Sequence, residues 1–171
     1  MPAVTIYTTA IPPLSMALKN LRAVLAKGEA YAKERNIDPA ILLNDRLHPT
    51  MFALTRQVQI ACDVAKGAAA RLAGVESPSF PDEEQSFEEL YARIDRTLAF
   101  LAAQHEESYT GAEDRMITLQ AGGQTMQWHG SDYLASFVLP NVYFHCTMVY
   151  ALMRKNGVVL TKQDFLAGGL G

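Results

Sequence analysis

The sequence has few of the residues and motifs that build metal centres or catalytic loops. It contains two cysteines, Cys62 and Cys146, which stand too far apart to form a zinc motif. It has no G-x-S-x-G elbow, no phosphate-binding loop and no H-E-x-x-H pair. The common signatures of serine hydrolases, phosphate-loop nucleotide binders and zinc proteases are therefore excluded. The two cysteines are predicted to be free thiols buried among apolar side chains.

Long apolar runs and an excess of basic charge are also missing. No stretch approaches the ~18 apolar residues of a membrane helix, and residues 1–6 lack the charged start of a secretory signal. The 15 basic and 18 acidic residues give a net charge of −3, which argues against a nucleic-acid-binding surface. With 49% hydrophobic residues, the 171-residue chain is predicted to form one globular domain over residues 1–171. We expect a cytoplasmic protein that binds neither membranes nor nucleic acids.

Apolar residues recur at helical spacing in four long segments. Leucines from Leu14 to Leu25 form such a stripe in a helix expected at 14–35, after an extended lead-in over residues 1–13. The other three expected helices, with the residues that cap them, are 50–72 with Thr50, 86–104 with the capping box Ser86-Phe-Glu-Glu89, and 132–154 with Ser131. A short helical turn is expected at 40–43, where Asp38 and Pro39 supply the start signal.

The segment before the last helix follows a different pattern. Apolar and polar residues alternate over 114–120 and again over 124–128, on either side of a turn at Gly122-Gly123. Two such runs around a glycine turn predict a β-hairpin. The predicted fold class is therefore all-α, a four-helix bundle with a small β-hairpin before the last helix, in either an up-down-up-down or a crossed order.

Two polar residues interrupt the apolar stripe of the last helix. Asn141 and His145 lie one turn apart on that stripe, and Pro140 beside them removes a backbone hydrogen bond and bends the helix near Ser136. A buried polar group costs free energy unless it is paired. His145 is therefore either a core histidine bonded to a neighbour or a residue that lines a functional pocket between the helices.

A row of polar residues on the helix expected at 50–72 offers possible partners for His145. The row consists of Arg56, Gln59, Asp63 and Lys66. It forms solvent-exposed charge pairs, or it turns inward so that Gln59 and Asp63 face Asn141 and His145. In the second arrangement an Asp63–His145 pair would raise the histidine pKa and support acid–base chemistry. Arg56 and Lys66 are competing partners that would neutralise Asp63 within its own helix.

Two segments of the chain resemble a known bacterial family. They are Met51-Phe-Ala-Leu-Thr-Arg-Gln-Val-Gln-Ile-Ala-Cys-Asp-Val-Ala-Lys-Gly67, and Pro140-Asn-Val-Tyr-Phe-His145 with Arg154-Lys-Asn-Gly157. They resemble the uncharacterised domain-of-unknown-function family nineteen-ninety-three, which is similar to the DinB/YfiT-like superfamily of metal-dependent enzymes. The resemblance covers essentially the whole chain. It implies a four-helix bundle, often a homodimer, with a cavity for a divalent transition metal between the helices.

The same resemblance implies where that metal would bind. DinB-like sites use one histidine of the second helix and an H-x-x-x-H pair of the last helix. The matching positions here are Gln59 and Asn141-x-x-x-His145, so that amides replace two of the three imidazoles. Neutral amides are poor ligands for transition metals. We therefore expect a degenerate metal site in which His145 is the remaining candidate ligand.

Three functions are compatible with these residues. The first is binding of a small ligand in a cavity near Gln59, Asp63, Asn141 and His145. The second is a metal-dependent hydrolase or transferase in which His145 and Asp63 act as ligands or as an acid–base pair. The third is a structural or interaction module whose buried polar residues only specify the register of the helices. We prefer the first.

Overall fold

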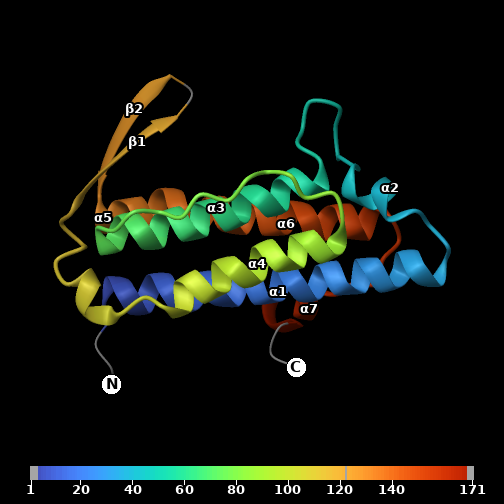
Figure 1. The fold of residues 1–171 in the computed structure, drawn as a ribbon, viewed down its shortest axis with the longest axis horizontal. Coiled ribbons are helices and arrows are strands. Elements are labelled where there is room, and N and C mark those ends of the chain that lie inside the picture. The colour runs from blue at the N-terminus through green and yellow to red at the C-terminus, as the bar shows by residue number, and fades with distance from the viewer. Residues whose placement is uncertain (1–3, 122, 169–171) are drawn as a thin grey trace.

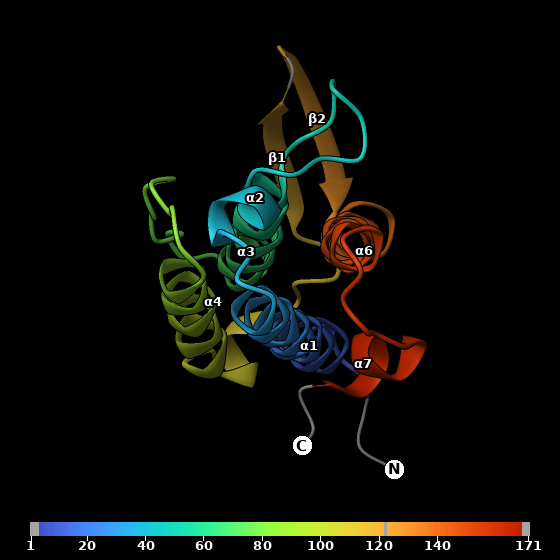
Figure 2. The same cartoon turned by 90° about the vertical axis from the view of Figure 1, so that its right-hand side faces the viewer.

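Four long helices surround the hydrophobic core. The computed structural model describes residues 4–121 and 123–168. Its long helices are α1 (Ile6–Glu34), α3 (Leu54–Ala73), α4 (Phe87–Ala102) and α6 (Leu139–Lys155). Each of α1 and α3 packs beside both α4 and α6 (Figures 1 and 2). The shorter elements are α2 (Pro39–Leu43), the 3-10 turn η1 (Glu106–Tyr109), β1 (Met116–Ala121), β2 (Gln124–His129), α5 (Gly130–Asp132), the π-helical turn η2 (Tyr133–Val138) and α7 (Lys162–Ala167). The expected helical fold with a hairpin before the last helix is confirmed.

The order of the helices is crossed. Figure 1 shows that the loop over residues 74–86 returns along α3 before α4 begins, so that α3 and α4 run in the same direction. The loop starts where Gly74 adopts a left-handed conformation, with φ of 73°, and ends α3 as the sequence predicts. It ends at Ser86, whose hydroxyl accepts a hydrogen bond from the Glu89 backbone in the predicted capping box.

The first helix begins eight residues earlier than the sequence analysis predicts. Instead of an extended lead-in, residues 6–13 are helical, and residues 1–3 lie outside the described residues. Thr5 caps the helix, because its hydroxyl accepts a hydrogen bond from the Thr8 backbone and the Thr8 hydroxyl accepts one from the Thr5 backbone. The helix continues through Pro12 and Pro13 although each lacks an N–H donor. Burial of Ala10, Ile11 and Leu14 in the core favours this path.

The helix expected to start at Thr50 starts at Leu54 instead. Thr50 does not cap it, since its hydroxyl lies 3.0 Å from His48 Nδ1 within an exposed loop. The Leu54 backbone N–H donates to the Asp45 carbonyl at 3.0 Å, which attaches this loop to the first turn of α3. The short helix α2 begins as expected, with the Asp38 carboxylate accepting from the Ala40 N–H.

The hairpin forms where the alternating pattern predicts it. β1 and β2 pair antiparallel, with Met116 opposite His129 and Leu119 opposite Met126. Gly123 has φ of 76°, whereas its partner in the expected turn, Gly122, lies outside the described residues. The hairpin projects from the helices (Figure 1). At its base the Trp128 ring lies 5.3 Å, centroid to centroid, from the Phe137 ring, which ties the hairpin to η2.

The last helical region contains a widened turn just before Pro140. The expected helix over 132–154 is present as α5, η2 and α6 in succession. Ser131 does not cap it, because the helical region already begins at Gly130 with His129 at the N-cap position. At the end of η2 the Leu139 N–H bonds to the Leu134 carbonyl, five residues back. Proline cannot complete the usual four-residue hydrogen bond, and a π-helical turn accommodates this by inserting one extra residue. The disturbance expected near Ser136 therefore takes the form of a wider turn.

The interior of the protein is mainly apolar and contains both cysteines. Cys62 and Cys146 are buried free thiols, as predicted, and burial raises the pKa of each to about 12. They are therefore protonated and unreactive at neutral pH. Over the described ranges of the chain, no helix combines the length and the apolar character needed to cross a bilayer.

Candidate functional site

His145 is a buried histidine that bonds to an amide of α3. Its side chain is 7% exposed, and its Nδ1 lies 2.6 Å from Oε1 of Gln57. Nε2 of Gln57 donates to the Phe52 carbonyl at 3.1 Å, which orients the amide so that its oxygen faces the histidine. His145 must therefore carry its proton on Nδ1 and donate it to Gln57. This is the buried, paired histidine that the sequence analysis offers as one of its two interpretations.

Electrostatics keep His145 neutral. Burial lowers its pKa below the ordinary value, and the nearby positive charge of Arg56 lowers it further. An Asp63 partner, as hypothesised from the sequence, would instead raise the pKa of His145. The structure contains no Asp63–His145 pair. Asp63 forms ion pairs with Arg93 and Lys66 instead. The imidazole is consequently a neutral hydrogen-bonding group at pH 7, without a carboxylate to orient it for proton transfer.

The predicted site residues of α3, Gln59 and Asp63, lie on a different side of this helix from the residue that contacts His145 of α6. Nε2 of Gln59 donates to Glu84 Oε2 at 2.9 Å, and Asp63 Oδ1 lies 2.8 Å from Arg93 Nη2 on α4. Gln57 is the residue that faces α6. Positions 57 and 59 are about 200° apart around a helix, so they cannot share a face. The structure brings His145 together with Gln57, and it places Gln59 and Asp63 in a separate cluster.

The donor set around His145 does not fit the transition metal that the resemblance implies. Asn141 lies one turn before His145 on α6 and is partly exposed. The groups on offer are therefore one imidazole, whose Nδ1 is already hydrogen-bonded, and the amides of Gln57 and Asn141. Amides are weak ligands for such ions. Among the described residues, no three histidine, cysteine, aspartate or glutamate side chains come together as a metal-binding group.

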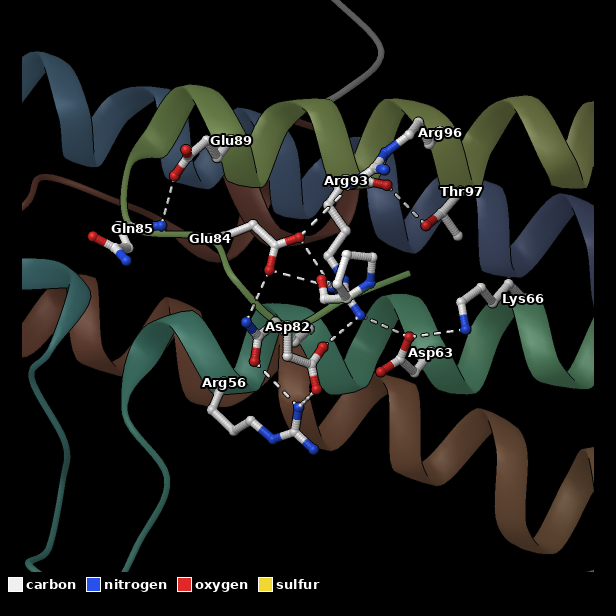
Figure 3. Close-up of polar contacts among 12 residues, drawn as sticks. Arg56, Asp63, Lys66, Asp82, Glu84, Gln85, Glu89, Arg93, Arg96 and Thr97 are labelled. Atoms are coloured by element: carbon white, nitrogen blue, oxygen red, sulfur yellow. Dashed lines mark hydrogen bonds and ion pairs between the residues drawn. The ribbon is translucent and has the colours of Figure 1, made fainter. Parts of the chain in front are cut away.

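A buried arginine on α4 organises the second cluster. Arg93 is 0% exposed, and its guanidinium lies within 2.9 Å of carboxylate oxygens of Asp63, Asp82 and Glu84. It also donates to the Pro81 carbonyl at 3.0 Å. Figure 3 shows these carboxylates reaching the guanidinium from α3 and from the loop over residues 74–86. The cluster therefore attaches the returning loop to both α3 and α4.

An aromatic residue of the same loop completes the cluster. The Phe80 ring lies 4.7 Å from the Arg96 guanidinium and 5.2 Å from Lys66 Nζ, distances typical of cation–π contacts. Arg56 also pairs with Asp82 at the edge of the cluster. None of the sequence patterns considered above predicts this arrangement. The signal was present, because Arg93 stands on the stripe that carries Leu90, Ile94 and Thr97, where a charged residue needs buried partners.

A cavity lies on another side of α6. Its volume is about 430 Å³, and it is lined by residues of α1, α6 and α7. Its wall is formed by Pro13, Met16, Ala17, Asn20, Leu21, Val24, Tyr143, Cys146, Thr147, Phe165 and Leu166. Of these lining residues none is an acid or a base that ionises near neutral pH. Burial raises the pKa of Tyr143 as well as that of Cys146, so both stay protonated.

The lowered pKa of His145 predicts how stability changes with pH. The unfolded chain protonates this residue near its ordinary pKa of about 6.5, whereas the folded protein resists protonation until lower pH. Between the two values the unfolded state binds more protons, so the free energy of unfolding should fall as the pH is lowered through this window and be unaffected above it. Urea denaturation of the wild type and the His145→Gln variant at about pH 8 and pH 5.5 measures the effect.

The variant should lose less stability than the wild type on acidification. A His48→Gln variant is the matched control, because His48 lies in an exposed loop. It should keep the pH dependence of the wild type. If wild type and His145→Gln lose the same free energy between the two pH values, His145 is not the buried neutral group described here.

Comparison with known proteins agrees with this architecture. The model of a family described as a domain of unknown function (DUF1993) matches residues 6–166. A crystal structure described as a DinB family member protein from Shewanella denitrificans is 38% identical to this chain, covers 94% of it and 90% of its own length, and superimposes with a TM-score of 0.88. No functionally curated protein matches the chain. The protein therefore belongs to the DUF1993 family and has a DinB-like fold.

Proposed function

We propose that this protein is a four-helix bundle that binds a small, uncharged and largely apolar molecule between α1, α6 and α7. The main support for this proposal is the cavity between these three helices. Its volume of about 430 Å³ lies within the range of about 300–1,000 Å³ that is usual for ligand sites. Its wall is mainly aliphatic and aromatic, with the Asn20 amide and the Tyr143 and Thr147 hydroxyls as polar groups. Such a wall favours a ligand that has a mainly apolar surface and makes a few hydrogen bonds.

The chemistry of the wall restricts the ligand to an uncharged one. An ion buried without a counter-charge costs several kcal/mol. The lining residues supply no such counter-charge, because Tyr143 and Cys146 are held in their protonated forms by burial. A charged substituent would therefore have to remain in solvent outside the cavity.

The proposed cavity is not lined by any of the ligand-binding residues that the sequence suggests. Gln59 and Asp63 are held by Glu84, Arg93 and Lys66. The hydrolase or transferase hypothesis gains no support, since His145 and Asp63 have different partners. We assign the Gln57–His145 pair a role in the fold, in which a buried bond between α3 and α6 favours one register of the two helices.

Two further expectations belong to the same proposal. The family resemblance implies a homodimer, and the composition suggests a cytoplasmic protein. Light scattering coupled to size-exclusion chromatography tests the first: a monomer mass at micromolar concentration would contradict it. Fractionation of the native host tests the second.

Filling the cavity should abolish binding of an apolar probe. N-phenyl-1-naphthylamine, a neutral dye whose fluorescence rises in apolar surroundings, is the probe. Ala17 lies in the wall and is 9% exposed, so Ala17→Phe places a ring inside the cavity. The dye affinity should fall at least about tenfold, or 1.4 kcal/mol. Ala26→Phe is the matched control, because Ala26 lies on the exposed side of α1. It should bind as the wild type does.

A second variant and a second probe make the test decisive. Thr147→Trp narrows the cavity from α6 and should reproduce the loss if Ala17→Phe fails to fold. 1-Anilinonaphthalene-8-sulfonate has the same rings plus a charged sulfonate, and it should bind the wild type at least about tenfold more weakly than the neutral dye. Equal binding of the neutral dye to wild type and both cavity variants would refute the proposed site, and stronger binding of the sulfonate would refute its uncharged character.

A further inference from the structure

We propose that two copies of this chain pair through the surface of α3 and α6 that lies between the hairpin and the loop over residues 44–53. The inference rests on the homodimer proposed above, and it adds which surface the two copies share. Figures 1 and 2 show that the hairpin and this loop project from the same side of the molecule, at opposite ends of α3 and α6. We call the surface between them the outer face. Its apolar residues are Phe52, Ile60, Val64, Leu119, Met126 and Phe144.

The centre of the outer face carries two exposed aromatic rings. The side chains of Phe52 and Phe144 are 56% and 51% exposed. Both residues lie beside the buried pair between α3 and α6. The Phe52 carbonyl accepts a hydrogen bond from Gln57, and the Phe144 ring meets the His145 ring edge to face, with centroids 5.2 Å apart. Exposed apolar area that is concentrated in one place is typical of a protein interface.

The hairpin extends this apolar surface. Leu119 and Met126 pair across it on the strand face that carries Trp128, whose ring contacts Phe137 of η2. That face is therefore turned towards the helices, and both paired residues are partly exposed on it. Residues 116–128 include no charged side chain. Because charged residues are a common means by which exposed strands avoid pairing with other chains, this hairpin is suited to contact a second molecule.

The outer face is large enough for a stable dimer. Ile60 and Val64, which follow Gln57 by three and seven residues, continue it along α3 and are partly exposed. α3 has 20 residues and is about 30 Å long, and two packed helices are about 20 Å wide. The resulting area of roughly 600 Å², enlarged by the hairpin and the loop, is close to the ~800 Å² that each partner contributes to a standard interface.

The two ends of the outer face carry opposite charges. Glu113, Asp114 and Asp132 are exposed at the base of the hairpin, and Arg46 is exposed in the loop over residues 44–53. In the described part of the chain, none of these four side chains takes part in an ion pair. A two-fold axis across the middle of the face turns one copy end for end, so that each acidic end meets Arg46 of the other copy. This charge complementarity favours a second copy of the chain as the partner.

A lysine at the centre of the outer face should separate the two copies. Phe144→Lys should raise the dimer dissociation constant at least about tenfold, because two lysines would be brought together near the axis. Sedimentation velocity at micromolar concentrations measures the change. Val159→Lys is the matched control, because Val159 is 79% exposed in the connection between α6 and α7. It should dimerise as the wild type does. If Phe144→Lys does not fold, Phe52→Glu tests the same surface.

Charge reversal tests the end-for-end arrangement. Arg46→Glu and the Glu113→Arg/Asp114→Arg variant should each dimerise about three- to tenfold more weakly than the wild type, because like charges then meet at both ends of the interface. An equimolar mixture of these two proteins should recover the wild-type affinity, because opposite charges meet again at both ends. A mixture as weak as its components would refute this arrangement.

The remaining outcomes separate this inference from the proposed function. A wild-type monomer would refute the homodimer and, with it, the shared outer face. A wild-type dimer that both Phe144→Lys and Phe52→Glu leave intact would refute the outer face alone. Binding of the neutral dye should be unchanged in Phe144→Lys, since Phe144 does not line the cavity. Dimerisation and ligand binding can therefore fail independently of each other.

Discussion

Replacement of Arg93 by methionine should lower the free energy of unfolding by about 3–5 kcal/mol. Methionine fills much of the same space but removes the charge that pairs with Asp63, Asp82 and Glu84. Asp63 and Asp82 keep Lys66 and Arg56 as partners. Glu84 has the largest loss, because its side chain is 5% exposed and its remaining cation, Arg96, is 3.9 Å away. A buried carboxylate without its partner accounts for most of the expected cost.

Urea denaturation followed by circular dichroism measures this loss. A second substitution tests its cause. In the Arg93→Met/Glu84→Gln variant the buried charge is absent, so the double variant should be more stable than Arg93→Met alone. Arg22→Met, which breaks the exposed pair with Asp95, should cost no more than about 1 kcal/mol. A loss of 1 kcal/mol or less for Arg93→Met would show that the cluster does not hold the returning loop.

Replacement of Gly130 by alanine should cost about 2–4 kcal/mol, at the upper end of the range for overpacking. Gly130 opens α5, where the chain leaves the hairpin. A Cβ atom at this position would overlap the backbone carbonyl oxygen of Ala112 and would lie 3.2 Å from Leu72 Cδ2. The carbonyl belongs to the chain entering the hairpin, and the Ser131 N–H donates to the neighbouring Glu113 carbonyl at 3.1 Å. Backbone has to move to relieve the overlap.

The matched control is Gly28→Ala in α1. A Cβ atom there also meets a neighbour, but the neighbour is the flexible end of the Met153 side chain. The side chain can adopt another rotamer, and alanine favours a helix over glycine by roughly 0.5–1 kcal/mol. This variant should therefore stay within about 1 kcal/mol of the wild type in thermal or urea denaturation. Similar stabilities for both alanine variants would contradict the close crossing at the base of the hairpin.

Features that depend on a few neighbouring residues follow directly from the sequence. Ser86 with Glu89 starts α4, Gly74 ends α3, and the alternation around the glycine turn produces the hairpin. Each of these signals acts within one or two turns of the chain. The starts of α1 and α3 are local predictions that were wrong. α3 begins at Leu54 and is not capped by Thr50. α1 begins at Ile6, because burial of the residues around Pro12 and Pro13 outweighs the intrinsic preference of proline.

The sequence does not determine how each helix is rotated about its own axis. α3 carries polar residues on two faces, and its sequence does not show whether Gln57 or Gln59 points towards α6. Tertiary packing decides this, since the Arg93 cluster takes Gln59 and Asp63 and leaves Gln57 for His145. Positions 57 and 59 are about 200° apart around the helix axis. Because Gln57 faces α6, His145 has a neutral structural partner instead of the supposed acid–base partner.

By itself, then, the sequence determined the helical class, the long helices, the hairpin, the buried thiols and the family. Only the tertiary structure decided the crossed order of the helices, the partners of Arg93 and the position of the cavity beneath α7. The physical reason is the separation along the chain between the residues that interact. Caps, turns and apolar stripes are set by interactions between residues close in the chain. Ion clusters and cavities arise where segments far apart in the chain meet, and many arrangements of the same stripes bury similar apolar area.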